Sequence, residues 1–167
     1  MRRTAPLLAA MLALSGCGLR PLYAGGAGGP VVQSLGAVEV AAIPGRAGWL
    51  VRTALVDRLG VAGTPRYRLE VELDDQVTGF GVRSDSAVTR ERRTLRARYR
   101  LIDTSAGANQ VVLDATAGSD AGIDVVSSEY ATIAAEQSAL ERLSTEVAEQ
   151  IATRLAVYAS RPDGAAR

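Results

Sequence analysis

The chain has no histidine and only one cysteine among its 167 residues. Without histidine, it lacks the side chain that most often serves as a general base or as a metal ligand. A single cysteine allows neither an internal disulfide nor a cysteine-rich metal site. The sequence also contains no nucleophile elbow, Walker loop or cluster of metal ligands. These absences predict a non-enzymatic protein without a metal or a resident cofactor.

Lysine is missing as well, so all 19 basic residues are arginines. They nearly balance the 18 acidic residues, and the resulting formal net charge of +1 argues against bulk binding to nucleic acid. Aromatic residues make up only 4% of the chain, against 47% for all hydrophobic residues. We therefore expect a core of alanine, valine, leucine and isoleucine, and no nucleic-acid partner.

The first 16 residues have the pattern of a secretory signal peptide. Two arginines near the start precede an apolar stretch from Ala5 to Leu14. This stretch is too short to cross a bilayer core of about 30 Å as a helix. It ends in Leu14-Ser15-Gly16-Cys17, which resembles the lipobox of bacterial lipoproteins. We expect removal of residues 1–16 and attachment of a diacylglycerol and an N-acyl chain to Cys17.

Residues 17–34 are expected to form the lipidated start and a flexible tether, because they include the glycine-rich run Ala24–Pro30. Two or more acyl chains anchor a protein stably, whereas a single chain of about 14 carbons binds only marginally. Gly18 is not aspartate, which permits sorting to the outer membrane by resemblance to enteric lipoproteins. The segment favours a lipid-anchored protein on the periplasmic face of the outer membrane. An ordinary secreted protein with an incidental cysteine is the alternative.

The rest of the chain is predicted to form one domain over residues 35–160, followed by a disordered tail at residues 161–167. Residues 35–43 are rich in valine and alanine and are expected to form a strand. Residues 46–59 are predicted to form an amphipathic helix, because apolar residues recur at intervals of four: Val51, Leu55 and Leu59.

Three segments alternate between apolar and polar side chains, as strands with one buried face do: residues 66–74, 89–102 and 109–117. In the third strand we expect four side chains to point inward: Val111, Leu113, Ala115 and Ala117. Residues 79–86 and 118–124 are expected to be polar loops. A long helix over residues 130–157 is predicted from an apolar stripe that Ile133 extends backwards: Leu140, Leu143, Val147, Ile151 and Leu155.

The predicted order is therefore β-α-β-β-β-α. Every strand shows a single apolar face, so the economical arrangement covers that face with both helices. We expect an α+β domain in which two helices pack on one face of a mixed, mostly antiparallel four-stranded sheet.

Two polar segments of this domain resemble sites only superficially. Asp74 and Asp75 are adjacent, and adjacent residues of a strand point to opposite faces, so they would not converge on one substrate. We interpret them as residues of a strand end. The segment 118–124 lacks the spacing of acidic residues that a calcium loop requires. Neither segment predicts catalysis.

One segment concentrates positive charge. Between residues 90 and 100 the only acid is Glu91, and we call the six arginines there the arginine stripe: Arg90, Arg92, Arg93, Arg96, Arg98 and Arg100. Their net charge of +5 with Glu91 can be balanced by acids on neighbouring strands or by an anionic ligand, or it can be left to solvent.

A hairpin centred near Val82 would place Glu72 opposite Arg92 and Asp74 opposite Arg90, which neutralises these two arginines. It would leave five arginines with no acid opposite, which we call the candidate anion site: Arg66, Arg68, Arg96, Arg98 and Arg100. Guanidinium groups bind phosphate through paired hydrogen bonds, so these residues are candidates for contact with phosphate or a lipid headgroup. Plain solvation or an acidic protein partner is the other interpretation.

Five segments of the mature chain share a pattern with a known family: Cys17–Tyr23, Val51–Leu59, Tyr67–Val71, Thr89-Arg90 and Ser128–Ala131. On these residues the chain resembles the LPS-assembly lipoprotein family, LptE. The family begins Cys-Gly-aromatic-x-Pro-Leu-Tyr, and Leu19 stands here in place of the aromatic residue. Similarity covers nearly the whole mature chain, although no motif beyond the lipobox is stringent.

The resemblance implies an outer-membrane lipoprotein that plugs the β-barrel protein LptD, helps to assemble it, and takes part in inserting lipopolysaccharide into the outer leaflet. Family members bind lipopolysaccharide, whose phosphates fit the candidate anion site. The alternative is an auxiliary lipoprotein of another envelope lipid-transport or secretion complex. A periplasmic hydrolase is disfavoured by the missing histidine and nucleophile motifs.

The lipobox predicts a specific covalent product. Mass spectrometry of the native protein should find the chain starting at Cys17, with its sulfur and its amino group acylated. A Cys17→Ser variant should keep its leader and should not be acylated. An unmodified sulfur, or a leader still attached in the wild-type protein, would contradict the anchor.

Overall fold

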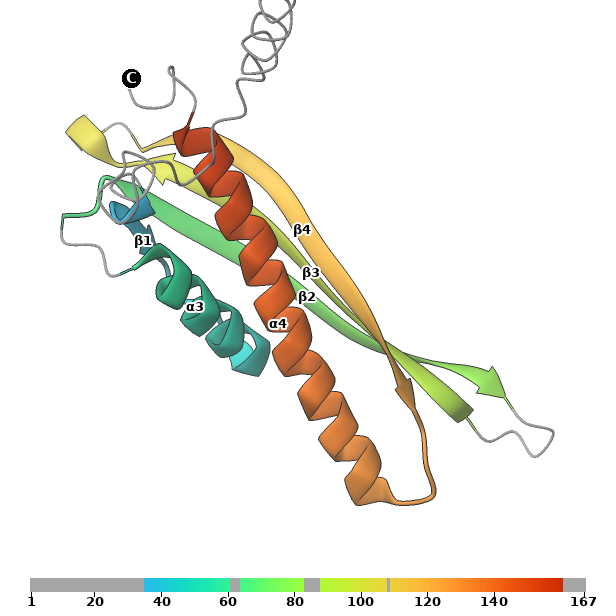
Figure 1. Cartoon of the computed structure of the whole chain (residues 1–167). Coiled ribbons are helices and arrows are strands. Elements are labelled where there is room, and N and C mark those ends of the chain that lie inside the picture. The colour runs from blue at the N-terminus through green and yellow to red at the C-terminus, as the bar shows by residue number, and fades with distance from the viewer. Residues whose placement is uncertain (1–34, 61–63, 83–87, 108, 161–167) are drawn as a thin grey trace, which may run out of the picture.

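A computed structural model describes residues 35–60, 64–82, 88–107 and 109–160 of the chain. The expected signal peptide, tether and tail lie outside these residues. The elements, in chain order, are β1 (Val38–Val40), α3 (Gly45–Leu59), β2 (Tyr67–Val82), β3 (Val88–Asp103), a single 3-10 turn (Ser105–Gly107), β4 (Gln110–Asp124) and α4 (Glu129–Ala159), as Figure 1 shows.

The strands form one mixed sheet in the order β1-β2-β3-β4. The short β1 is parallel to β2, and the other two pairings are antiparallel. Both helices lie on the same face of the sheet, with α3 beside α4 (Figure 1). We call the opposite face, which neither helix covers, the outer face. The predicted α+β fold and its β-α-β-β-β-α order are confirmed.

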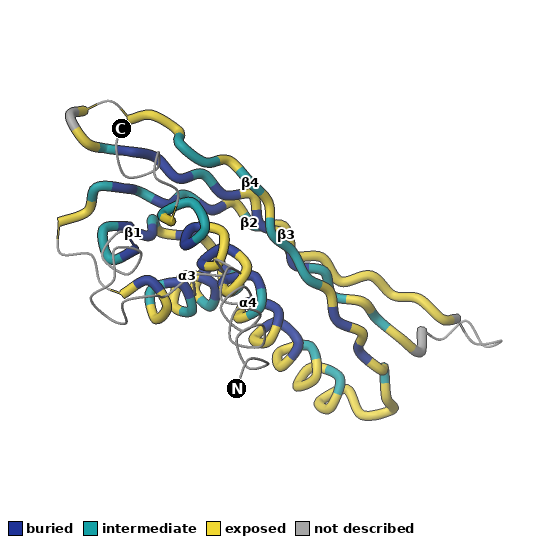
Figure 2. Tube along the Cα trace, turned by 45° about the horizontal axis from the view of Figure 1, so that its top comes forward, coloured by how far each residue is buried: buried dark blue, intermediate teal, exposed yellow. Residues whose placement is uncertain are grey.

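The core lies between this sheet and the two helices, as the dark tube in Figure 2 shows. It is built almost entirely from aliphatic side chains. On the sheet side, these belong to odd-numbered residues of β2 and β3, which turn toward the helices. The predicted stripes of both helices are buried, with exposures between 0% and 4%: Val51, Leu55, Leu59, Leu140, Leu143, Val147, Ile151 and Leu155. Tyr99, at 2% exposure, is the largest fully buried side chain.

The strands differ from the expected ones in length. β1 covers only Val38–Val40, whereas β2 continues to Val82, through residues expected to form a loop. The predicted loop at 118–124 is also wrong, because these residues form the second half of β4 and pair with β3. Two of them, Ala121 and Ile123, are buried on the helix-covered face. Their glycine and aspartate neighbours have low strand propensity, but pairing with β3 overrides it.

Two details of side-chain direction also differ. Val111 is 46% exposed, because a β-bulge at the start of β4 pairs it with Ile102 while Leu113 pairs with Leu101. The extra residue turns Val111 to the outer face. Ile133 is 43% exposed, so the buried stripe of α4 does not extend back to it. Among the described residues, no helix is both long and apolar enough to cross a membrane.

β4 is an edge strand, and α4 contributes hydrogen bonds to its free side. The Gln150 amide donates from Nε2 to the carbonyl of Gly118 and accepts its N–H at Oε1, both at 3.2 Å. Glu146 lies one helical turn before Gln150 on α4, and its Oε2 accepts a hydrogen bond from the Ser119 hydroxyl at 2.6 Å. Gln150 therefore occupies the place that a neighbouring strand would take at Gly118.

A close approach of backbone to backbone fixes the start of α3. A Cβ atom added at Gly48 would lie 2.5 Å from the Ile43 carbonyl oxygen, which cannot move aside easily. Gly48→Ala should therefore lower the free energy of unfolding by about 1–3 kcal/mol, measured by urea denaturation of the unlipidated mature chain. Gly122→Ala is the control, since no heavy atom lies within 4 Å of its Cβ position. Equal stability of the two variants would contradict the packing at α3.

Candidate functional site

The arginine stripe lies mostly on the outer face of the sheet, on the central strand β3. Its even-numbered members turn away from the helices, because the odd-numbered neighbours Leu95, Ala97 and Tyr99 are buried beneath them. β2 and β4 flank β3 on either side. The charges of both neighbours therefore decide whether the stripe is free to bind an anion.

The predicted register of the β2–β3 hairpin is wrong, although even-numbered residues do lie opposite even-numbered ones. Asp74 lies opposite Arg96, Glu72 opposite Arg98 and Glu70 opposite Arg100. The cause is that β2 continues past its glycines to Val82, so the turn falls beyond Val82 rather than at it. The acids of β2 consequently meet the part of the stripe that was expected to be unpaired.

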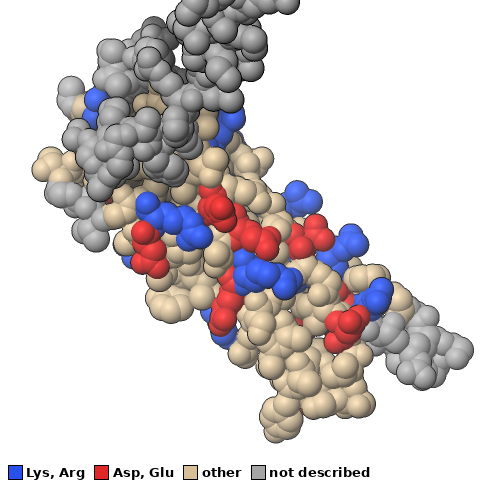
Figure 3. Space-filling view, viewed as in Figure 1, with Lys and Arg blue, Asp and Glu red and all other residues tan. Residues whose placement is uncertain are grey.

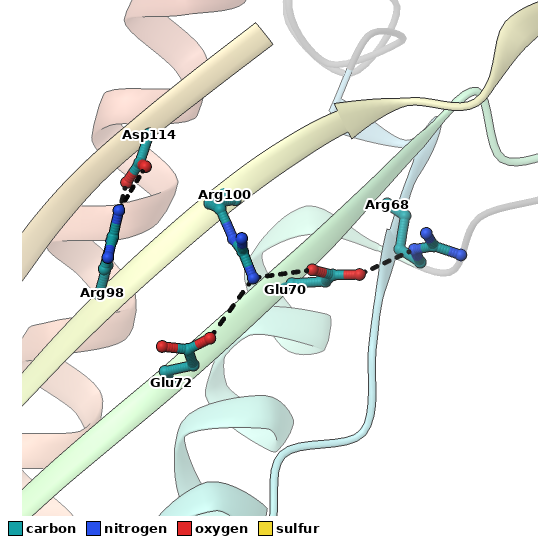
Figure 4. A network of polar contacts seen from close by, with 6 residues as sticks. All are labelled: Arg68, Glu70, Glu72, Arg98, Arg100 and Asp114. Atoms are coloured by element: carbon teal, nitrogen blue, oxygen red, sulfur yellow. Dashed lines mark hydrogen bonds and ion pairs between the residues drawn. The ribbon is translucent and has the colours of Figure 1, made fainter. Parts of the chain in front are cut away.

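Arg100 joins two of these acids on β2. Its Nη2 lies 3.4 Å from Glu70 Oε2 and 3.4 Å from Glu72 Oε1. On the other side of Glu70, Oε1 lies 3.3 Å from Arg68 Nε. Figure 4 shows this chain of contacts across β2 and β3. Arg68 and Arg100, two members of the candidate anion site, thus share the carboxylate of Glu70.

Arg98 pairs in the opposite direction, with Asp114 of β4 (Figure 4). Its Nε donates to Oδ1 at 3.3 Å and its Nη2 to Oδ2 at 2.9 Å. This hydrogen-bonded pair raises the pKa of Arg98 and lowers that of Asp114. Asp114 is an acid that the sequence interpretation did not weigh against the stripe.

β4 supplies two further partners near its end. Arg90 Nε lies 3.1 Å from Asp124 Oδ1, and Arg92 Nε lies 3.8 Å from Asp120 Oδ2. Both acids fall in the segment that was predicted to be a loop, which is why sequence reasoning missed them. Asp120 and Asp124 lie six and ten residues after Asp114. This even-numbered spacing is the signal that would have placed all three acids on the outer face.

Arg66 is held at the end of the sheet rather than beside the stripe. Its Nη2 lies 3.2 Å from Asp103 Oδ2, and its guanidinium lies 5.1 Å from the centre of the Tyr67 ring. Burial alone would raise the pKa of Asp103. Hydrogen bonds from the Ser105 hydroxyl and amide and from Arg66 outweigh burial, so this pKa is lowered. A hairpin centred near Val82 would have placed Arg66 and Arg68 opposite Arg98 and Arg96. In the structure Arg68 lies opposite Ile102 instead, so these expected positions are wrong.

Arg96 is the exception within the candidate anion site. It is exposed, and no carboxylate of the described residues lies within ion-pair distance of it. Asp74, opposite it, instead accepts both contacts from the Gln76 amide, at 3.0 and 3.1 Å. Arg96 lines a hollow of about 550 Å³ whose rim includes Arg98, Thr116 and Gln150. Arg96 alone keeps a free guanidinium beside this hollow.

The outer face as a whole is electrically balanced among the described residues of β2, β3 and β4. It carries six arginines: Arg68, Arg90, Arg92, Arg96, Arg98 and Arg100. It also carries six acids: Glu70, Glu72, Asp74, Asp114, Asp120 and Asp124. A cationic strand between two acidic ones is a ladder of exposed ion pairs, not an open anion site.

Arg93, the remaining member of the stripe, turns to the helix-covered face. Its Nε donates to Asp75 Oδ1 at 2.9 Å, its Nη2 donates to Oδ2 at 2.6 Å, and its Nη1 donates to the Glu136 carbonyl at 3.2 Å. The hydrogen bond to Asp75 raises the pKa of Arg93. Asp74 and Asp75 do point to opposite faces, but they lie within β2, so their interpretation as a strand end is wrong.

Within the described ranges, no three histidine, cysteine, aspartate or glutamate residues gather in a way that could hold a metal ion. The arrangement of the outer face is suited to contact with a polar surface or with single anionic groups.

Comparison with solved structures shows related folds. A lipoprotein of Caulobacter crescentus is 30% identical with a TM-score of 0.64, and the match covers 78% of this chain and 96% of that one. The minor lipoprotein of Acinetobacter baumannii is 11% identical with a TM-score of 0.56, over 72% and 90% of the two chains. Rare lipoprotein B of Shewanella oneidensis is 9% identical with a TM-score of 0.55, over 72% and 93%. The last two likenesses concern the fold alone.

No curated protein matches the chain. The model of one protein family, described as "LptE: Lipopolysaccharide-assembly", matches residues 35–155, which span β1 to the last turns of α4. Because this match covers most of the chain, the protein belongs to the lipopolysaccharide-assembly family LptE.

Proposed function

We propose that the protein is an outer-membrane lipoprotein that plugs and helps to assemble the LptD β-barrel and takes part in inserting lipopolysaccharide into the outer leaflet. The family match over residues 35–155 is the observation that carries this proposal. The lipobox at Cys17 supports the lipid anchor.

The outer face supports a role in gripping a partner. It is long and polar, with arginines and acids alternating between neighbouring strands. The interior of a transmembrane β-barrel is polar too, so such a wall can exchange ion pairs and hydrogen bonds with this face. Exposed ion pairs contribute little to stability, and rearranging them on contact therefore costs little.

Copurification tests the partner. The full-length lipidated chain, purified from detergent-solubilised outer membranes, should carry LptD as its main barrel-sized companion, identified by mass. Depleting the chain should leave LptD misassembled and reduce surface lipopolysaccharide. Recovery of an inner-membrane transporter instead, or normal LptD after depletion, would favour an auxiliary lipoprotein of another envelope complex.

For lipopolysaccharide itself, we propose that contact within the candidate anion site centres on Arg96. The other members already hold carboxylates, so a phosphate would have to displace Asp114 from Arg98 or Glu70 from Arg100. Arg96 needs no such displacement. Its guanidinium can donate two hydrogen bonds to one phosphate.

Charge reversal tests this contact. Replacing Arg96 and Arg98 together by glutamate should weaken lipopolysaccharide binding, and Arg96→Glu alone should account for about tenfold of the loss. Binding is measured at low salt, where exposed charges are least screened. Arg142→Glu on α4, whose side chain is 62% exposed, is the matched control and should bind as the wild type does. Unchanged binding by Arg96→Glu would refute the assignment.

A further inference from the structure

Exposed apolar side chains gather at one end of the molecule. Seven large hydrophobic residues are exposed in the described part of the chain, and five of them lie near the β2–β3 hairpin end or the start of α4: Val77, Phe80, Val126, Tyr130 and Ile133. Tyr130 is 86% exposed and Val126 is 51% exposed. Figure 2 shows this end mainly in the colour of exposed residues. Isolated exposed apolar residues are ordinary, but such a concentration marks an interaction site.

The packing of the helices explains why this end is uncovered. α3 begins only at Gly45, and the buried residues of α4 begin at Ala139, ten residues into the helix. Between the start of α3, the sheet and α4 lies a hollow of about 430 Å³. Ile133 lines it together with Arg93 of β3, and Val77 lies opposite Arg93 in the register. Val77 therefore lies on the same side of the sheet as this hollow, whereas Phe80 lies on the outer face beside Arg92.

Charge at this end is acidic among the described residues. From Asp75 to Val82, from Val88 to Arg93 and from Asp120 to Gln137, three arginines face six acids, and each arginine already pairs with one acid. Three acids have no ion pair there: Glu91, Glu129 and Glu136. In Figure 3, the surface over the first turns of α4 is mostly tan, which marks uncharged residues.

Glu91 provides a second, independent observation. It is an odd-numbered residue of β3, so it points to the helix-covered face, between Gly79 and Ile123 on the neighbouring strands. Its Oε2 is buried and has no hydrogen-bond partner. A carboxyl oxygen left buried without a donor carries a free-energy penalty, because its lost hydration is not replaced. A donor from another molecule would remove this penalty.

We propose that these residues form a docking surface, here named the distal surface: Val77, Glu91, Val126, Glu129, Tyr130, Ile133 and Glu136. Its occupant is a protein partner that presents apolar side chains next to lysine or arginine. An anionic lipid surface fits poorly, because the three arginines of β3 at this end are paired and the three unpaired acids outnumber Arg46, the one arginine bordering the hollow that has no ion pair among the described residues. A second copy fits poorly as well, because the acids of both copies would repel each other.

The inference rests on the proposed function, since LptD is the partner used to test it. The lipidated full-length chain is coexpressed with LptD in three forms: wild type, the Tyr130→Ser/Ile133→Ser variant, and the Glu129→Lys/Glu136→Lys variant. Both variants should recover LptD at least tenfold less efficiently. Trp49→Ser is the matched control, because Trp49 is 64% exposed on α3 outside the distal surface, and it should recover LptD within twofold of wild type.

Glu91→Gln separates a functional role from a structural one. Removing the charge should leave the thermal unfolding of the free chain unchanged or raise its midpoint, and it should nevertheless weaken LptD recovery. A residue that serves only the fold would not move these two measurements in opposite directions.

The outcomes are distinct. If wild type binds LptD and both distal variants bind it equally well, or if Trp49→Ser loses as much as they do, the distal surface is wrong and the proposed function stands. If wild type captures no LptD, the proposed function falls and takes this inference with it. A mature chain that is dimeric in solution, and that Tyr130→Ser/Ile133→Ser makes monomeric, would identify a second copy as the occupant and overturn the proposal.

Discussion

The two-residue repeat of the strand pleat is the constraint on which the rest of the structure depends. In β2 and β3 it sends aliphatic side chains to the helices and charged ones to the other side. Because the chain has few aromatic residues, this strict division is what lets small aliphatic side chains fill a core beneath two helices. The same division leaves the outer face to polar contacts. It also places the charged residues Arg93 and Glu91 on the helix-covered face.

Neutralisation by both neighbours changes the meaning of the arginine stripe. Glu70, Glu72 and Asp114 occupy guanidinium groups that in isolation would attract phosphate. The outer face therefore combines high charge density with no net charge, and its selectivity comes from geometry. Arg96 stands out only because Asp74 is engaged by Gln76.

Much of this fold was predictable, because both helices and the central parts of the strands carry strong periodic patterns. α3 and α4 begin and end within two residues of the predicted limits. The hairpin register was not predictable, since it depends on where the chain turns, and the glycines before Val82 look like a loop. The error spread to the site: with the wrong register, the acids of β2 were matched with the wrong arginines, and Asp120 and Asp124 of β4 were placed in a loop. The bulge at Val111 left no sequence signal.

The side-chain amide of Gln150 on Gly118 has a consequence beyond the single molecule. An unpaired edge strand of 15 residues is a template on which another chain can add a strand, and such growth leads to aggregation. By filling one rung in the middle, Gln150 divides that template into two shorter pieces. The open sheet is thereby protected against the addition of strands from further copies of the chain.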